Sequence, residues 1–88
     1  MKDKIQVLYF GSSTCKPCEY VKPIVKTMQN VGWDITYVAT EDHPDLVTNY
    51  DISSVPAFIK LIDGKEVGRH VGLLPLKTFK EFLEKPID

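Results

Sequence analysis

The chain has 88 residues, of which 43% are hydrophobic and 26% charged, a balance that is ordinary for one globular domain. Its formal net charge of -1 gives no electrostatic basis for binding nucleic acid or an anionic membrane. No apolar run approaches the roughly 20 residues that span a bilayer, and the N-terminus lacks the apolar core of a signal peptide. We therefore expect a single domain over residues 1–88 and a cytoplasmic location.

The first predicted element is a strand over residues 4–10, whose large apolar side chains follow one another with little alternation. This pattern is typical of a parallel strand that is covered on both faces. Residues 11–14 predict a turn because glycine, serine and threonine follow one another there. Either Ser13 or Thr14 is the expected cap of the helix that comes next.

That helix is predicted from Cys15 to about Val31. Its apolar side chains recur at a spacing of three and four residues, which places them on one helical face. Pro23 lies inside the pattern and is expected to kink the helix, because proline removes a backbone hydrogen bond. Gly32 is expected to end it.

A second strand is predicted over residues 34–40, which are rich in β-branched and aromatic side chains. A short helix over residues 45–50 follows, with Pro44 at its start. We expect Trp33 to be a core or rim anchor and His43 to be a solvated loop residue.

The last third of the chain predicts a hairpin and a helix. Strands are expected over residues 57–62 and 66–71, because Asp63-Gly64 between them is a strong hairpin turn. The final helix begins after Pro75 and carries its apolar side chains along one side. The whole order is β-α-β-α-β-β-α, which predicts a four-stranded mixed α/β sheet with helices on both faces.

The segment that carries chemistry is Cys-Lys-Pro-Cys, residues 15–18, which holds both cysteines of the chain. It lies between a strand and a helix, so the first sulfur is at the helix N-terminus, where unpaired N–H groups favour an anion. The pKa of Cys15 should therefore fall below the value of about 8.5 of a free cysteine, and Lys16 acts in the same direction. Pro17 suits the first helical turn.

Besides an inert pair or a chance spacing, two interpretations of the cysteine pair are open. In the first, Cys15 attacks a substrate disulfide and Cys18 resolves the mixed disulfide. In the second, the pair is half of a zinc site, which normally needs four ligands. The two histidines, His43 and His70, are far apart in sequence and form no His pair. We therefore favour the redox interpretation and expect no bound metal.

Taken together, four features of the sequence resemble the thioredoxin family, in a shortened form of about glutaredoxin size. The segment 15–18 is similar to the family's Cys-Gly-Pro-Cys, and Val55-Pro56 to its hydrophobic-Pro pair, whose proline is cis. Asp63-Gly64-Lys65 resembles the hairpin turn, and Val71-Gly72 the segment before the last helix. The resemblance extends from about residue 4 to residue 83 and implies the thioredoxin fold.

The resemblance also implies functions for individual residues. Cys15 would be the nucleophile and Cys18 the resolving thiol, with no cofactor besides their disulfide. The backbone at Val55, beside a cis Pro56, would pair with a bound substrate strand. The residues implied to contact substrate are Thr14, Lys16, Pro17, Val55, Pro56, Gly72 and Leu73.

The sequence departs from the family at two of these positions and at two others. Thr14 stands where the family has a tryptophan, and Lys16 replaces a glycine, which favours the thiolate. Tyr9 stands in place of a buried aspartate under the disulfide, and Tyr37 in place of the lysine partner of that aspartate. Tyr9 is therefore expected to pack in the core. The proton acceptor for Cys18 is left open between water and a nearby acid, Glu41 or Asp42.

The preferred function is a monomeric reductase of protein disulfides that receives electrons from a thioredoxin reductase. A glutaredoxin-like protein that uses glutathione is the second interpretation. It is less favoured because residues 71–73 offer neither the second glycine nor the acid of the family's glutathione segment. A redox-inactive binding or metal-holding module on the same fold is the third. Nucleic acid and membranes are not expected partners.

Overall fold

The computed structural model of the chain describes residues 5–73 and 75–84. Its elements, in chain order, are β1 (Ile5–Gly11), α1 (Lys16–Asn30), β2 (Ile35–Ala39), α2 (Pro44–Asn49), β3 (Ala57–Ile62), β4 (Lys65–Val71) and α3 (Leu76–Glu84). This order confirms the prediction, and the predicted boundaries that fall within the described residues lie within one or two residues of the observed ones. The predicted strand start at Lys4 and the ends of the predicted domain lie outside the described residues.

The four strands form one mixed sheet in the order β2-β1-β3-β4. β1 pairs in parallel with β2, as the helical crossover predicts, and antiparallel with β3, while β3 and β4 form the predicted hairpin. The two central strands, β1 and β3, are the ones with nearly continuous apolar runs, because both of their faces are covered.

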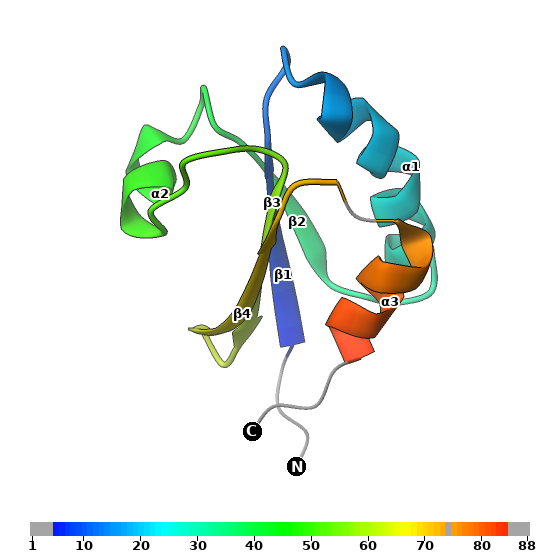
Figure 1. Ribbon diagram of the computed structural model, residues 1–88. Helices are drawn as coiled ribbons and strands as arrows, with labels where there is room; N and C mark the ends of the chain where they lie inside the picture. Colours follow the sequence, from blue (N-terminus) through cyan, green and yellow to red (C-terminus); the bar gives the residue numbers. More distant parts are fainter. Residues whose placement is uncertain (1–4, 74, 85–88) are drawn as a thin grey trace.

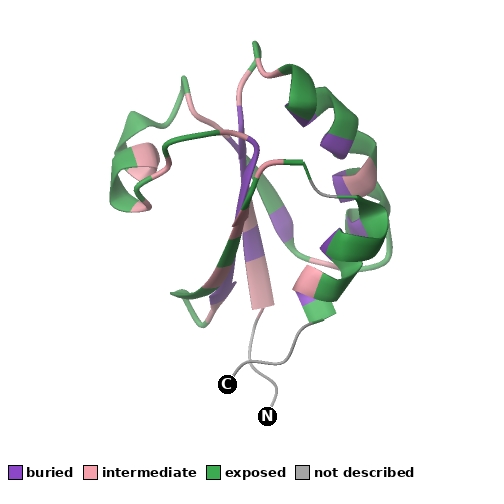
Figure 2. Cartoon of the chain, in the orientation of Figure 1, coloured by how far each residue is buried: buried purple, intermediate pink, exposed green. Residues whose placement is uncertain are grey.

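The helices lie on both faces of the sheet, α1 and α3 on one face and α2 on the other (Figure 1). Successive residues of a strand point to opposite faces, so Tyr9 contributes to the core under α1 and α3 and Phe10 to the core under α2. The helices on the two faces differ in how many of their side chains are buried. Both α1 and α3 bury side chains against the sheet, whereas no residue of α2 is fully buried (Figure 2).

Helix α1 covers the sheet through Val21, Val25 and Met28, which are all buried. Pro23 lies on the exposed side, and the helix continues through it over 15 residues; the kink expected there stays a prediction. Gly32 directly follows Val31, the C-cap of α1, and has a φ of +111°, a conformation that favours glycine. The predicted end of the helix is confirmed.

Lys60 of β3 is the one buried charged residue in the described part of the chain, with 4% of its surface exposed. Its ammonium group donates a hydrogen bond of 3.2 Å to the carbonyl oxygen of Phe82, near the C-terminal end of α3. A cation at that end is favourable, because the carbonyl groups there are unpaired and the helix dipole is negative. The contact ties α3 to the centre of the sheet.

Candidate active site

The candidate site lies at one end of the sheet, where β1 and β4 end and β3 begins. The register pairs Ala57 of β3 with Phe10 of β1 on one side and with Val71 of β4 on the other. Neighbouring strands are about 4.8 Å apart, so the segments that follow β1, precede β3 and follow β4 adjoin one another there. These segments are the Cys-Lys-Pro-Cys turn, the Val55-Pro56 pair and the Gly72 turn that the sequence singled out.

A backbone hydrogen bond joins the Gly72 turn to the Val55-Pro56 pair. The Gly72 N–H donates a hydrogen bond of 2.8 Å to the carbonyl oxygen of Pro56. Gly72 has a φ of +104°, which a residue with a side chain adopts only with strain. The Val55–Pro56 peptide bond is cis, as the family resemblance implied. Pro56 is buried and Val55 is half-buried, packed against the cores on both faces.

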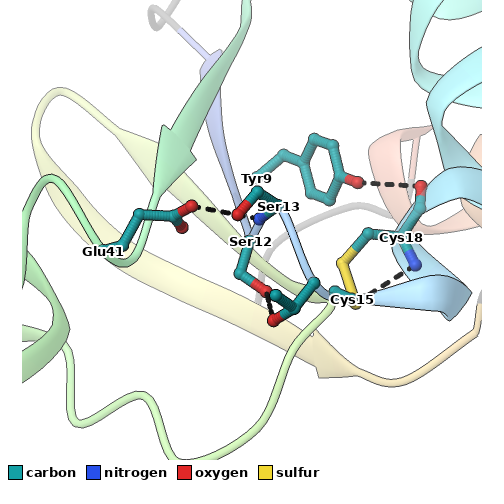
Figure 3. Close-up of a disulfide and its surroundings, with 7 residues drawn as sticks. Tyr9, Ser12, Ser13, Cys15, Cys18 and Glu41 are labelled. Atoms are coloured by element: carbon teal, nitrogen blue, oxygen red, sulfur yellow. Dashed lines mark hydrogen bonds between the residues drawn. A yellow bond between two sulfur atoms is a disulfide. The ribbon is translucent and has the colours of Figure 1, made fainter.

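Cys15 is the N-cap of α1, with extended backbone angles of φ -85° and ψ 105°. Its sulfur accepts a hydrogen bond of 3.2 Å from the N–H of Cys18 (Figure 3). The prediction of Ser13 or Thr14 as the cap was therefore wrong. The helix begins one residue later than a hydroxyl cap would need, so the cysteine sulfur takes the accepting position.

The two cysteines form a disulfide, with their Cα atoms 5.3 Å apart. Its two ends have different surroundings, and we call Cys15 the outer cysteine and Cys18 the inner cysteine. The outer cysteine is half-buried and lies at the border of the core under α1 and α3. The inner cysteine is a member of that core and has 0% of its surface exposed. A molecule that approaches from solvent can therefore reach only the outer sulfur.

Tyr9 lies beside the inner cysteine. Its hydroxyl donates a hydrogen bond of 3.1 Å to the carbonyl oxygen of Cys18 (Figure 3). The ring is 2% exposed and stacks on Phe58, with ring centres 5.2 Å apart. The prediction that Tyr9 packs in the core is confirmed. Burial, with a smaller contribution from Tyr37, raises the pKa of Tyr9 to about 12, so the hydroxyl stays neutral at physiological pH.

Glu41 reaches the turn before the outer cysteine. Its carboxylate accepts a hydrogen bond of 3.1 Å from the Ser13 N–H and is directed at that turn (Figure 3). Hydrogen bonds from Ser13 lower the pKa of Glu41. From the sequence, Glu41 was expected only as one possible acceptor for the Cys18 proton, and its contact with Ser13 was not predicted. The two residues are 28 positions apart, and no local pattern points to such a pair.

The other residues implied to contact substrate lie mostly on the surface. Thr14, Lys16 and Pro17 are exposed at the start of α1. Leu73 has 54% of its surface exposed, and its carbonyl oxygen is 3.2 Å from Nε2 of His70. A carbonyl group only accepts, so Nε2 carries the proton in this hydrogen bond.

Within residues 5–73 and 75–84, no three side chains of His, Cys, Asp or Glu come together as a possible metal site. No helix within these residues has the length and apolar character needed to cross a membrane.

Comparisons with known proteins agree on one family. The family model described as Thioredoxin matches residues 1–85. Thioredoxin Y2, a chloroplastic protein of Arabidopsis thaliana, is 33% identical over 88 residues, covering 97% of this chain and 53% of the relative. The thioredoxin of Staphylococcus aureus is 26% identical over 84 residues, covering 92% and 81%. The chain thus spans only about half the length of the Arabidopsis protein.

Solved structures have the same fold. A mutant thioredoxin from Halobacterium salinarum aligns with a TM-score of 0.89 at 22% identity, over 98% of this chain and 77% of its own. The thioredoxin pre-protein of Schistosoma mansoni, in its reduced form, aligns with a TM-score of 0.87 at 26% identity, over 96% and 80%.

Proposed function

The chain belongs to the thioredoxin family, and on that premise we propose that it is a thiol–disulfide oxidoreductase that reduces disulfides in other proteins. The observation that carries this proposal is the disulfide at the end of β1, which has an accessible outer sulfur and a buried inner one. An exposed sulfur paired with a sheltered one divides the reaction into attack and resolution.

In the attack step, the Cys15 thiolate of the reduced protein bonds to one sulfur of the substrate disulfide. The substrate bond breaks, and the other substrate sulfur leaves as a thiolate that takes a proton from water. The position of Cys15 supports this step, because its sulfur lies at the N-terminus of α1 and accepts the Cys18 N–H. Both features stabilise a negative charge on that sulfur, so we expect a pKa of Cys15 below that of a free thiol.

In the resolution step, Cys18 loses its proton and bonds to the Cys15 sulfur. The mixed disulfide breaks, the second substrate sulfur leaves and takes up a proton, and the Cys15–Cys18 disulfide of the structure results. Two electrons have then passed from the dithiol to the substrate. Because Cys18 is wholly buried, it reacts only with the Cys15 sulfur, after that sulfur has bonded to the substrate.

We expect an extended segment of the substrate to bind along the backbone at Val55. The exposed side chains of Thr14 and Leu73 would contact its neighbouring residues. Thr14 is small where the family has tryptophan, so this rim offers less apolar area to a partner. Fewer contacts of this kind lower affinity, and we expect weak, transient binding of substrates.

The cysteine variants test this function. In an insulin reduction assay, Cys15→Ser should lose all activity above the uncatalysed rate, because the attacking sulfur is gone. Cys18→Ser should instead accumulate a covalent adduct with the substrate, visible by mass spectrometry and reversed by dithiothreitol. Normal turnover by Cys15→Ser would contradict the mechanism.

The electron donor is tested by following NADPH oxidation. We propose a thioredoxin reductase as the donor, so NADPH consumption should require that enzyme together with this protein and insulin. Consumption only with glutathione and glutathione reductase would favour the glutaredoxin-like alternative. Protein purified under reducing conditions should also contain no stoichiometric zinc. Bound zinc together with no reductase activity would instead indicate a metal-holding module.

A further inference from the structure

The Tyr9 hydroxyl is a buried polar group whose position is set by packing. Its ring lies between that of Phe58, stacked at 11°, and that of Tyr37, tilted at 57°, with both ring centres 5.2 Å away. These contacts leave the ring little freedom to turn. The hydroxyl therefore has a defined place, and its hydrogen bond goes to the carbonyl oxygen of Cys18.

Both backbone polar groups of the inner cysteine are engaged near the disulfide. The N–H of Cys18 donates to the sulfur of Cys15, and its carbonyl oxygen accepts the Tyr9 hydroxyl at 3.1 Å. The Cα atom that bears the inner sulfur lies between these two groups. With the backbone held on both sides, the position of that sulfur relative to Cys15 depends mainly on one side-chain torsion.

Gly11 shows that the Tyr9 hydroxyl and the inner sulfur border the same small space. A Cβ atom built on Gly11 would lie 3.2 Å from the sulfur of Cys18, 3.4 Å from the Tyr9 oxygen and 3.0 Å from the Tyr37 ring. All three groups thus lie around one point beside the Gly11 backbone, which is too close to them for a methyl group to fit without a shift. Tyr9 is therefore adjacent to the reacting end of the inner cysteine as well as to its backbone.

No buried carboxylate contacts the inner cysteine in the described part of the chain, because Lys60 is the one buried charged residue there. The carboxylate of Glu41 is exposed and accepts its hydrogen bond from Ser13 in the turn before the outer cysteine. The neutral Tyr9 hydroxyl is therefore the polar side-chain group that contacts the inner cysteine.

We propose that Tyr9 is a positioning residue for resolution, holding Cys18 so that its sulfur faces the mixed disulfide on Cys15. This inference rests on the proposed function. In that step the Cys18 sulfur bonds to the Cys15 sulfur, the bond to the substrate sulfur breaks, and the Cys18 proton ends on the departing substrate sulfur. Tyr9 keeps its own proton throughout. Its contribution is to reduce the orientations that the Cys18 thiol samples before it reacts.

The test measures the two steps separately in single turnovers of the full chain. A peptide disulfide with a fluorophore and a quencher on its two halves reports attack, and mass spectrometry of acid-quenched samples reports decay of the mixed disulfide. Tyr9→Phe keeps the ring and removes the hydroxyl. Its resolution rate constant should fall about 2- to 10-fold, the range expected for the loss of one hydrogen bond, while its attack rate constant changes less than about 2-fold.

Tyr50→Phe is the matched control, because it removes a hydroxyl from a ring that packs against Phe10 on the opposite face of the sheet. Both of its rate constants should equal those of the wild type. A Tyr9→Phe protein with unchanged resolution would overturn the inference, as would one whose attack and resolution slow equally. If the wild type itself forms no mixed disulfide, the proposed function fails, and the inference fails with it.

Discussion

The two ends of the disulfide differ more than their separation of three residues suggests. The outer cysteine precedes α1, is half-buried and follows a turn that Glu41 holds from the end of β2. The inner cysteine lies in the first turn of α1, has no exposed surface and contacts Tyr9. One cysteine therefore lies at the border of the core and the other inside it.

This difference shows how the start of one helix gives two cysteines three residues apart different surroundings. The helix begins between the two cysteines, and its first turn directs the second one toward the sheet. We therefore expect the reactivity of the outer sulfur to depend on the helix N-terminus, and that of the inner sulfur on core packing. Changes made to the core or to the turn should affect the two ends separately.

The largest expected effect is a loss of stability, caused by a substitution in the core that surrounds the inner cysteine. Phe79 is 0% exposed and packs on Phe58, which in turn stacks on Tyr9. Phe79→Ala should lower the free energy of unfolding by about 3–5 kcal/mol, because it leaves a cavity in this core. Denaturant unfolding of the oxidised proteins measures the loss.

Leu76→Ala, one helical turn earlier in α3, is the control for that experiment. Leu76 has 45% of its surface exposed, so its removal should change the free energy of unfolding by less than about 0.5 kcal/mol. Equal losses in the two variants would show that burial against the sheet does not decide the stability of this layer.

The second prediction concerns the reactivity of the two thiols in the reduced protein. Iodoacetamide should alkylate Cys15 at least about tenfold faster than Cys18 at pH 7, because the outer sulfur is accessible and its thiolate is stabilised. Mass spectrometry of peptides after short reaction times measures both rates. In denaturant the two alkylation rates should converge. Faster alkylation of Cys18 than of Cys15 in the folded protein would contradict this prediction.

The third prediction concerns alkaline pH. The pKa of Tyr9 is raised by burial from 10.0 to about 12, so the folded state binds its proton more tightly than the unfolded state. The resulting stabilisation is fully present below pH 10 and is lost as the pH rises toward 12. Unfolding experiments across this range should show a steeper loss of stability for the wild type than for Tyr9→Phe. Identical slopes would mean that Tyr9 titrates like an exposed tyrosine.

The smallest expected effect is on the pH dependence of stability and comes from the turn before the outer cysteine. Hydrogen bonds from Ser13 lower the pKa of Glu41 below its ordinary value of 4.5. The associated stabilisation is present above that value and is lost as the pH falls through the lowered pKa. Glu41→Gln should remove this dependence, which unfolding measurements between neutral and acidic pH detect. Asp42→Asn is the control, and an equal change in both variants would rule out a specific contribution from Glu41.

The elements of the fold were predictable because their signals are local. The apolar run of β1, the spacing of apolar residues in α1 and the turn at Asp63-Gly64 each act within a few residues. The same locality identified the two cysteines as the centre of the site, since a strand, a turn and a helix follow one another around them.

What the tertiary structure alone decided is which distant groups meet at the disulfide. The Glu41–Ser13 contact spans 28 residues, and the apposition of Tyr9 and Tyr37 depends on the register of β1 against β2. A shift of that register by one residue would turn every side chain of one strand to the other face of the sheet. Sequence patterns determine which face of an element is buried, whereas the partner of each buried polar group follows from how the elements pack.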